Sequence, residues 1–214
     1  MQDDTQQRFC YAASHMVIIS GHHDPHQTTL QGHCQPVSCL ATSVDRSVIV
    51  SADSGPDSLM VLWDVKTATP FWSVSKPHPY GVVAMQLFPD ARQLVALSGL
   101  LPGGSEQQIM SVWDLSNPTQ TPSFSALIPA GDAKSFLCLS NDGKELITNG
   151  SDHVCFWELT ASTVSLATSP TRSQEFKEAK HATGDFTISS YLPDGLQVIL
   201  SMKFHMASSM AQSV

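Results

Sequence analysis

The sequence is poor in charged residues. Only 14% of its 214 residues are Asp, Glu, Lys or Arg, whereas an average globular domain has about 25%. Acidic residues outnumber basic residues by 19 to 11, and the net charge of -8 argues against binding to nucleic-acid phosphates. No apolar run approaches the ~20 residues that span a bilayer, and the opening segment MQDDTQQRF lacks the apolar core of a secretory signal. We therefore expect a cytoplasmic protein that neither binds nucleic acid nor inserts into a membrane.

The cysteines do not suggest a disulfide framework. There are five, an odd number, and no two are spaced as C-x-x-C. Without a secretion signal, reduced thiols are the default. Cys39, Cys138 and Cys155 lie in the apolar runs VSCLA, FLCLS and VCFWE, where we expect them to act as small buried hydrophobic residues.

What the sequence does contain is an internal repeat. Three short β-type runs end in a similar way: LMVLWD at Asp64, IMSVWD at Asp114 and HVCFWE at Glu158. Their tryptophans recur at a spacing close to the ~40–45 residues of a WD repeat, which folds as a four-stranded propeller blade. One Trp-Asp pair is weak evidence, but three at near-constant spacing predict a WD40-type β-propeller.

Alternating apolar residues and turn residues place the other strands. The clearest unit begins at Gly32-His33 and predicts four strands, at Val37–Thr42, Val48–Ala52, Leu59–Trp63 and Phe71–Val74. The next two units repeat this order, with strands predicted at Val82–Phe88, Gln93–Ser98, Ile109–Trp113, Ser135–Ser140, Glu145–Thr148 and Val154–Trp157. Turns containing Asp45-Arg46, Pro89-Asp90 and Asn141–Gly143 separate the first two strands of the three units.

Both ends of the chain read as incomplete blades. Tyr11–Ser20 resembles a third strand and Thr28–Gln31 a fourth, while Phe186–Leu192 and Leu196–Ser201 resemble the first two strands of a later blade. We therefore expect an all-β, partial propeller of about four to five blades of four antiparallel strands, whose ring is incomplete. The predicted organisation is a partial blade at 1–31, three blades at 32–164, an exposed connection at 165–183, the start of a blade at 184–200 and a divergent tail at 201–214.

A buried polar network explains why certain residues recur in WD repeats. A His of the Gly-His step, a Ser or Thr of the second strand, an Asp of the following turn and the Trp of the third strand bond to one another, which makes their burial tolerable. In the unit at 32–64 we assign these roles to His33, Ser51, Asp57 and Trp63.

The other two units depart from that set. The second has Ser98 and Trp113 but Gln107 where the Asp is expected, and the third has Thr148, Asp152 and Trp157 but Asp132 where the His is expected. We expect their polar networks to be weaker.

The stretch from 32 to 64 also carries a more specific resemblance. Its start, GHC-x-PVSCL, and its end, SAD-x-GPDSL-x-x-x-WD, resemble a WD-repeat family of cilia and flagella, and so do YAASHMVI and FTISSYLPDG. That family belongs to the calmodulin- and spoke-associated complex at the base of the third radial spoke of the axoneme. The resemblance covers roughly residues 8–200, and the tail from about Ser201 departs from it.

The resemblance implies a non-catalytic scaffold that links the radial spoke base to the doublet microtubule and supports ciliary or sperm flagellar motility. Its implied partners are axonemal spoke and calmodulin-associated subunits. The alternative is another cytoplasmic WD-repeat adaptor, either a ubiquitin-ligase substrate receptor or a tubulin-binding propeller. Propellers host many functions, so the fold does not choose between these.

Few residues suggest chemistry. His22, His23, His26 and Asp24 cluster in GHHDPH, but no second ligand cluster accompanies them, so we interpret them as a polar loop rather than a metal site. A Cys–His pair built from Cys34 or Cys39 with His33 is disfavoured because His33 has a structural role. We predict no catalytic residue, cofactor, metal or small-molecule substrate, and no enzymatic activity.

Two segments remain as candidate protein-contact sites. His78 and Tyr80 lie in KPHPYG, which is either a contact loop on an exposed face or an ordinary turn. The second segment, Leu100–Gln108, surrounds a Pro-Gly-Gly insertion between two strands, and loops of this kind often bind partners.

Overall fold

The computed structural model describes residues 8–21, 26–101, 107–128, 133–150, 154–159, 186–191 and 197–201. Across these ranges, no helix is long and apolar enough to cross a membrane. The described residues form strands β1 (Arg8–Ala13), β2 (Met16–Gly21), β3 (Gln27–Gln31), β4 (Val37–Thr42), β5 (Val48–Asp53), β6 (Leu59–Asp64), β7 (Thr69–Ser75), β8 (Val82–Leu87), β9 (Gln93–Ser98), β10 (Gln108–Asp114), β11 (Phe124–Ile128), β12 (Phe136–Leu139), β13 (Glu145–Asn149), β14 (Val154–Glu158), β15 (Phe186–Tyr191) and β16 (Gln197–Ser201).

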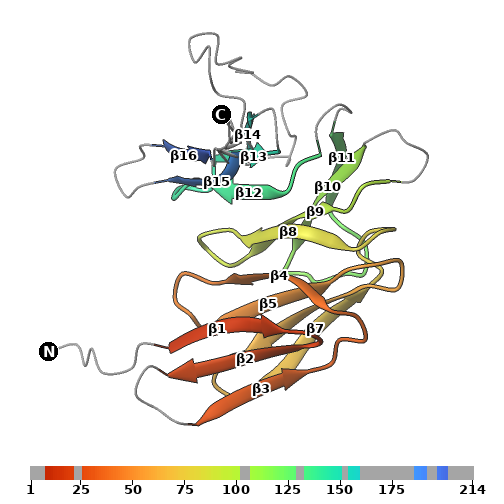
Figure 1. The fold of residues 1–214 in the computed structure, drawn as a ribbon, viewed down its shortest axis with the longest axis vertical. Helices are drawn as coiled ribbons and strands as arrows, with labels where there is room; N and C mark the ends of the chain where they lie inside the picture. Colours follow the sequence, from red (N-terminus) through yellow and green to blue (C-terminus); the bar gives the residue numbers. More distant parts are fainter. Residues whose placement is uncertain are drawn as a thin grey trace, which may run out of the picture.

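The strands form five antiparallel sheets that follow the chain, and we call them blades 1 to 5. Blade 1 is β1-β2-β3, blade 2 is β4-β5-β6-β7, blade 3 is β8-β9-β10-β11, blade 4 is β12-β13-β14 and blade 5 is β15-β16. They lie one after another along the molecule, from blade 1 in red and orange to blades 4 and 5 in green and blue (Figure 1). The first strands of successive blades are neighbours, since β4 contacts β8, β8 contacts β12 and β12 contacts β15. The fold is the all-β, open, WD40-type arrangement that the repeat predicted.

Blade 1 differs from the prediction. Tyr11–Ser20 was expected to be one strand, but the chain reverses at Ser14, whose φ is 55°, so that β1 and β2 pair as a hairpin. The prediction was wrong because the run YAASHMVI is apolar on both sides of a turn that contains no Gly, Pro, Asn or Asp. The structure also adds β11 as the outer strand of blade 3.

The turn between the first two strands is the same in blades 2, 3 and 4. An Asp at its third position accepts a bond from a backbone N–H two residues later, at Asp45, Asp90 and Asp142. The next residue has positive φ in each case: 61° at Arg46, 55° at Ala91 and 69° at Gly143. Asp is favoured in such turns because its carboxylate satisfies the local backbone.

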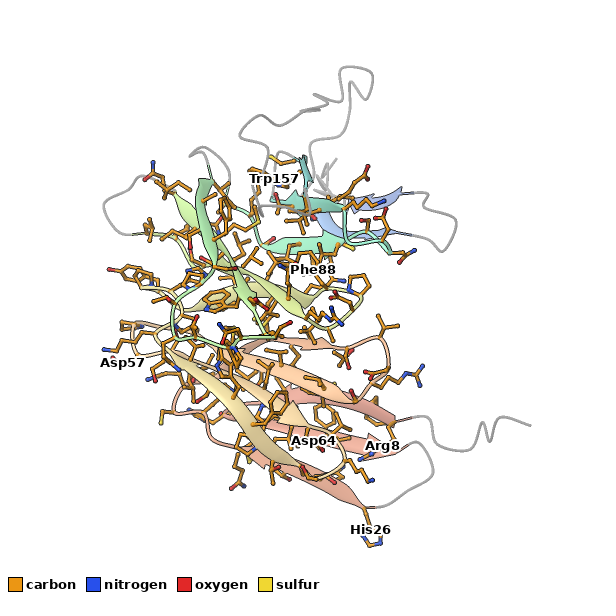
Figure 2. The ribbon with its side chains drawn as sticks, turned by 180° about the vertical axis from the view of Figure 1, so that it is seen from behind. Arg8, His26, Asp57, Asp64, Phe88 and Trp157 are labelled. Atoms are coloured by element: carbon orange, nitrogen blue, oxygen red, sulfur yellow. The ribbon has the colours of Figure 1, made fainter. Side chains whose placement is uncertain are left out.

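The cores lie between blades rather than within them. Each blade is a single sheet, so each of its faces is buried only against a neighbour. Three clusters result. Blades 1 and 2 contribute Val17, Ile19, Leu30, Ile49, Val61 and Trp63; blades 2 and 3 include Val50, Met60, Val74, Leu94, Ala96 and Trp113; blades 3 and 4 include Phe88, Val95, Met110, Leu137, Leu146 and Trp157. Figure 2 shows Phe88 and Trp157 on either side of the boundary between blades 3 and 4.

Some predicted segments lie outside the described residues. These are the connection at 165–183, the tail from 202 to 214, the Pro-Gly-Gly insertion at 102–104, and Asp132 and Asp152 of the third repeat unit. Of the candidate ligands His22, His23, Asp24 and His26, only His26 is described, and it is exposed.

Candidate interaction surface

Blade 2 contains a complete buried polar network. The Nε2 atom of His33 lies 2.6 Å from the hydroxyl of Ser51, and Trp63 Nε1–H donates to the same hydroxyl over 2.7 Å. The other ring nitrogen of His33, Nδ1, lies 3.0 Å from the carboxylate of Asp53. The side chains of both His33 and Asp53 are fully buried, so the four groups satisfy one another where water does not reach them.

The acid of this network is Asp53, and the prediction of Asp57 was wrong. Asp57 is 74% exposed and forms an ion pair with Lys76 over 2.9 Å, and Figure 2 shows it at the margin of the molecule. Strand β5 continues to Asp53, two residues after Ser51, so both side chains lie on one face of the sheet. That period of two was the available sequence signal, whereas Asp57 was assigned because an Asp was expected in the turn that follows the second strand.

Asp53 also fixes the loops on either side of His33. Its carboxylate accepts the backbone N–H of Leu59 at the start of β6 and, over 3.4 Å, the N–H of Gln35. One buried carboxylate thus joins the loop before β4, the end of β5 and the start of β6. The His-containing loop is therefore held on a rigid base.

Blade 3 has an equivalent set of positions with different residues. In β9 and β10, Ala96 lies opposite Ser111, as Ser51 lies opposite Val61 in blade 2. Ala96 therefore takes the place of Ser51. His78 precedes Ala96 by the same number of residues as His33 precedes Ser51, so His78 is the histidine of blade 3.

His78 is buried, so the prediction that it contacts a partner from an exposed face was wrong. Its side chain packs edge-on against Trp113, with ring centroids 5.6 Å apart, and the residue is 2% exposed. Because Ala96 has no hydroxyl, His78 Nε2 and Trp113 Nε1 are both buried without a hydrogen-bond partner. Burial lowers the pKa of His78 from 6.5 to about 4, partly opposed by a hydrogen bond to the backbone of Ala96.

Ser98 stands where Asp53 stands in blade 2. Its hydroxyl accepts the backbone N–H of Ile109 over 2.8 Å and donates to the carbonyl of Gly99. The first of these bonds matches that between Asp53 and Leu59. The structure thus places Ser98, and not Gln107, at the acid position.

Gln108 is also buried, at 2% exposure, which corrects its prediction as a contact residue. Its side-chain amide donates to the carbonyl of Ser98 over 2.9 Å and to that of Lys134 over 2.8 Å. Its carbonyl accepts the Lys134 N–H over 2.6 Å. The amide therefore pairs with the main chain of Lys134 as a neighbouring strand would, and it connects blade 3 to blade 4.

Tyr80 and Leu100 are the predicted contact residues that the structure leaves exposed, at 40% and 45%. Their loops lie side by side because Gly99 N–H donates to the carbonyl of Gly81 over 3.0 Å. A Cβ at Gly99 would lie 2.7 Å from the carbonyl oxygen of Tyr80, so this close approach requires glycine. We call Tyr80, Leu100 and this junction the Tyr80 surface.

Blade 4 retains part of the network, since Trp157 Nε1–H donates to the hydroxyl of Thr148 over 3.0 Å.

At the opposite end of the strands from the Tyr80 surface, a cleft of about 510 Å³ opens between the turns of blades 3 and 4. Its acids serve as turn caps. For example, a bond from the Ser140 hydroxyl is the main cause that lowers the pKa of Asp142.

The described residues contain no cluster of three or more potential metal ligands. Both ring nitrogens of His33 are engaged by Asp53 and Ser51. Burial raises the pKa of the Cys39 thiol to about 12, so its thiolate is scarce near neutral pH. A Cys–His pair of His33 and Cys39 therefore has neither a free base nor an activated nucleophile.

Comparison with known proteins identifies the family. The family described as the CFAP251 N-terminal domain matches residues 1–204. The chain belongs to this CFAP251 family. Cilia- and flagella-associated protein 251 of Chlamydomonas reinhardtii is 32% identical over 93% of this chain. The proteins of the same name from Tetrahymena thermophila and Pongo abelii are 29% and 30% identical over 73% and 70% of it.

These CFAP251 relatives are much longer than the chain. It spans 26%, 16% and 13% of the Chlamydomonas, Tetrahymena and Pongo proteins. Among solved structures, a chain of the mitotic checkpoint complex superposes with a TM-score of 0.65. The superposition covers 90% of this chain and 55% of the chain from the checkpoint complex, at 19% sequence identity. This is a similarity of fold alone.

Proposed function

We propose that the chain is part of a non-catalytic scaffold of the ciliary or flagellar axoneme, and that it binds protein partners through the Tyr80 surface. The observation that carries the proposal is the match of residues 1–204 to the CFAP251 family. The scaffold would link the base of a radial spoke to the doublet microtubule and support motility, with spoke and calmodulin-associated subunits as partners.

The geometry supports a contact role for the Tyr80 surface. Tyr80 and Leu100 are exposed, whereas His78 and Gln108, which lie near them along the chain, are buried. Exposed aromatic and aliphatic side chains on a rigid base are typical of the anchor residues of protein interfaces. Gln108 joins blade 3 to blade 4 and His78 packs against Trp113, so binding rather than chemistry is the function that this face supports.

Affinity purification from a ciliated cell tests the proposal. A tagged chain is compared with the double variant Tyr80→Ser, Leu100→Ser and with a control, Leu127→Ser, at a residue that is 61% exposed on the outer strand β11. We expect the wild type and the control to appear in the axonemal fraction with spoke proteins, and the double variant to lose those partners.

Three results would count against the proposal. Absence of the wild-type chain from the axonemal fraction would contradict the axonemal role, and recovery with a cullin-type ligase would favour the alternative adaptor function. Full retention of all partners by the double variant would contradict the role of the Tyr80 surface.

A further inference from the structure

Blades 2 and 3 each bury a histidine, but the two rings differ in the hydrogen-bond partners around them. In blade 2, His33 lies 3.0 Å from the carboxylate of Asp53 and 2.6 Å from the hydroxyl of Ser51. In blade 3, His78 Nε2 has no partner and Ala96 stands where the hydroxyl would be. We propose that protonation of His78 is an acid-sensitive switch that releases the Tyr80 surface. The release of partners rests on the proposed function of the Tyr80 surface. The protonation of His78 and the opening of blade 3 do not depend on it.

The surroundings of His78 offer no counter-charge in the described residues. Strands β8 (VVAMQL) and β9 (QLVALS) contain no titratable side chain, and neither does β11 (FSALI). On β10 the only titratable group is Asp114, which caps the N–H of Ser116.

The loop of His78 and the adjacent blade 2 offer none either. Tyr80 is exposed, and Lys76 pairs with Asp57 at the surface. In blade 2, Cys39 is a half-buried thiol on β4, Asp53 is engaged by His33, and the terminal Asp64 of β6 caps the N–H of Thr67. Strand β7 has no titratable group.

The direction of the pH dependence follows from this burial. An imidazolium is costly to bury without a partner, and burial lowers the pKa of His78 from 6.5 to about 4 in the closed blade. An opened blade, in which the ring is hydrated, takes up the proton already near pH 6.5. The free energy that favours the closed blade, in which His78 is buried, is therefore fully present above pH 6.5. It decreases as the pH falls toward 4.

A chain of backbone bonds connects His78 to the surface loops. The carbonyl of His78 accepts the N–H of Gly81 over 3.3 Å, and the carbonyl of Gly81 accepts the N–H of Gly99 over 3.0 Å. Gly81 has a φ of 77°, and a Cβ there would lie 2.6 to 2.9 Å from the backbone of Ser54 and Gly55. The junction is tightly fitted, so an outward movement of His78 would separate the loops that carry Tyr80 and Leu100.

Hydrogen exchange of the full chain tests the switch without any partner. Amide protection in residues 76–100 is measured between pH 7 and pH 5 after correction for intrinsic exchange, with residues 32–63 of blade 2 as internal reference. From the two pKa values, the open population of blade 3 should rise roughly twentyfold on going to pH 5. The capped acids Asp45, Asp64 and Asp142 have lowered pKa values and stay ionised in this range.

Two variants isolate the imidazole. His78→Gln, which cannot protonate, should remove the pH dependence of protection in residues 76–100. Ala96→Ser supplies a hydroxyl that accepts a bond from the imidazolium, so it should reduce the twentyfold change; it also tests the switch if His78→Gln does not fold. The switch is overturned if wild-type blade 3 is equally protected at both pH values, or if Ala96→Ser leaves the change unaltered. Either failure would leave the proposed scaffold function untouched.

Discussion

At the scale of single residues, position along a strand decides which acid is structural. Asp53 and Asp57 are four positions apart in one short stretch. Asp53 ends β5 with its side chain on the face of Ser51, whereas Asp57 lies in the turn beyond. The buried carboxylate joins three segments, and the exposed one forms a solvated ion pair, which is worth little.

Replacing these two acids should therefore have unequal effects. Asp53→Ala leaves His33 and the N–H of Leu59 buried without their partner, and we expect it to lower the free energy of unfolding by roughly 3 kcal/mol. Asp57→Ala is the matched control and should change it little. Urea unfolding followed by tryptophan fluorescence makes the comparison, and similar losses for the two variants would contradict the assignment.

The thiols provide a second test at this scale. Cys34 is exposed, whereas burial raises the pKa of Cys39 to about 12. A thiol reagent at pH 8 should modify Cys34 quickly and Cys39 only on unfolding, because the thiolate is the reactive form. Mass spectrometry of the modified peptides gives the order, with Cys34→Ser as control. Early modification of Cys39 in the folded chain would show that β4 is not packed against blade 3.

At the scale of elements, the blades are joined by side chains that imitate strand pairing. Gln108 pairs with the main chain of Lys134 in this way. The carbonyl of the Gln86 side chain likewise accepts the N–H of Leu139 from the next blade over 2.8 Å. Such bonds satisfy main-chain groups in and just before β12 that its pairing with β13 leaves available.

Removing the Gln108 amide should loosen blade 4 from blade 3. Gln108→Ala leaves both main-chain groups of Lys134 without this partner, and we expect a loss of about 2 kcal/mol. The adjacent Gln107→Ala is the control. Hydrogen exchange should rise selectively in residues 133–150. If both variants behave alike, Gln108 does not join the blades.

The local elements were largely predictable, because they depend on short-range patterns. Strand Gln93–Ser98 has the bounds that its alternation predicted, and the Asp-containing turns lie where turn residues cluster. The hairpin at Ser14 was missed because positive φ at a serine has little sequence signal.

At the scale of the whole molecule, one face of blade 1 is left uncovered by the other residues that the structure describes. Its inner side is buried against blade 2 through Val17, Ile19 and Leu30. On β1, Phe9 and Tyr11 are 51% and 39% exposed and stack on each other, with ring centroids 6.1 Å apart. In blades 2 and 3 the equivalent strands β5 and β9 are buried on both faces, so this exposure reflects the open end of the array.

An exposed apolar sheet face favours self-association. We expect the 214-residue chain to associate in a concentration-dependent manner, and the double variant Phe9→Ser, Tyr11→Ser to reduce this. Leu127→Ser, at an exposed residue of β11, serves as control. Sedimentation velocity over a range of concentrations measures the effect. A wild-type chain that is monodisperse and unfolds cooperatively would contradict the prediction that the array is open.

The sequence by itself determined the repeat, most strands, the turns and the three residues His33, Ser51 and Trp63, because each follows from spacing or alternation along the chain. Only the tertiary structure decided that His78 and Gln108 are buried while Tyr80 and Leu100 are exposed. The physical reason is that each core cluster of the described residues lies between two blades. Burial therefore depends on the register and packing of a neighbouring sheet, which no local pattern contains.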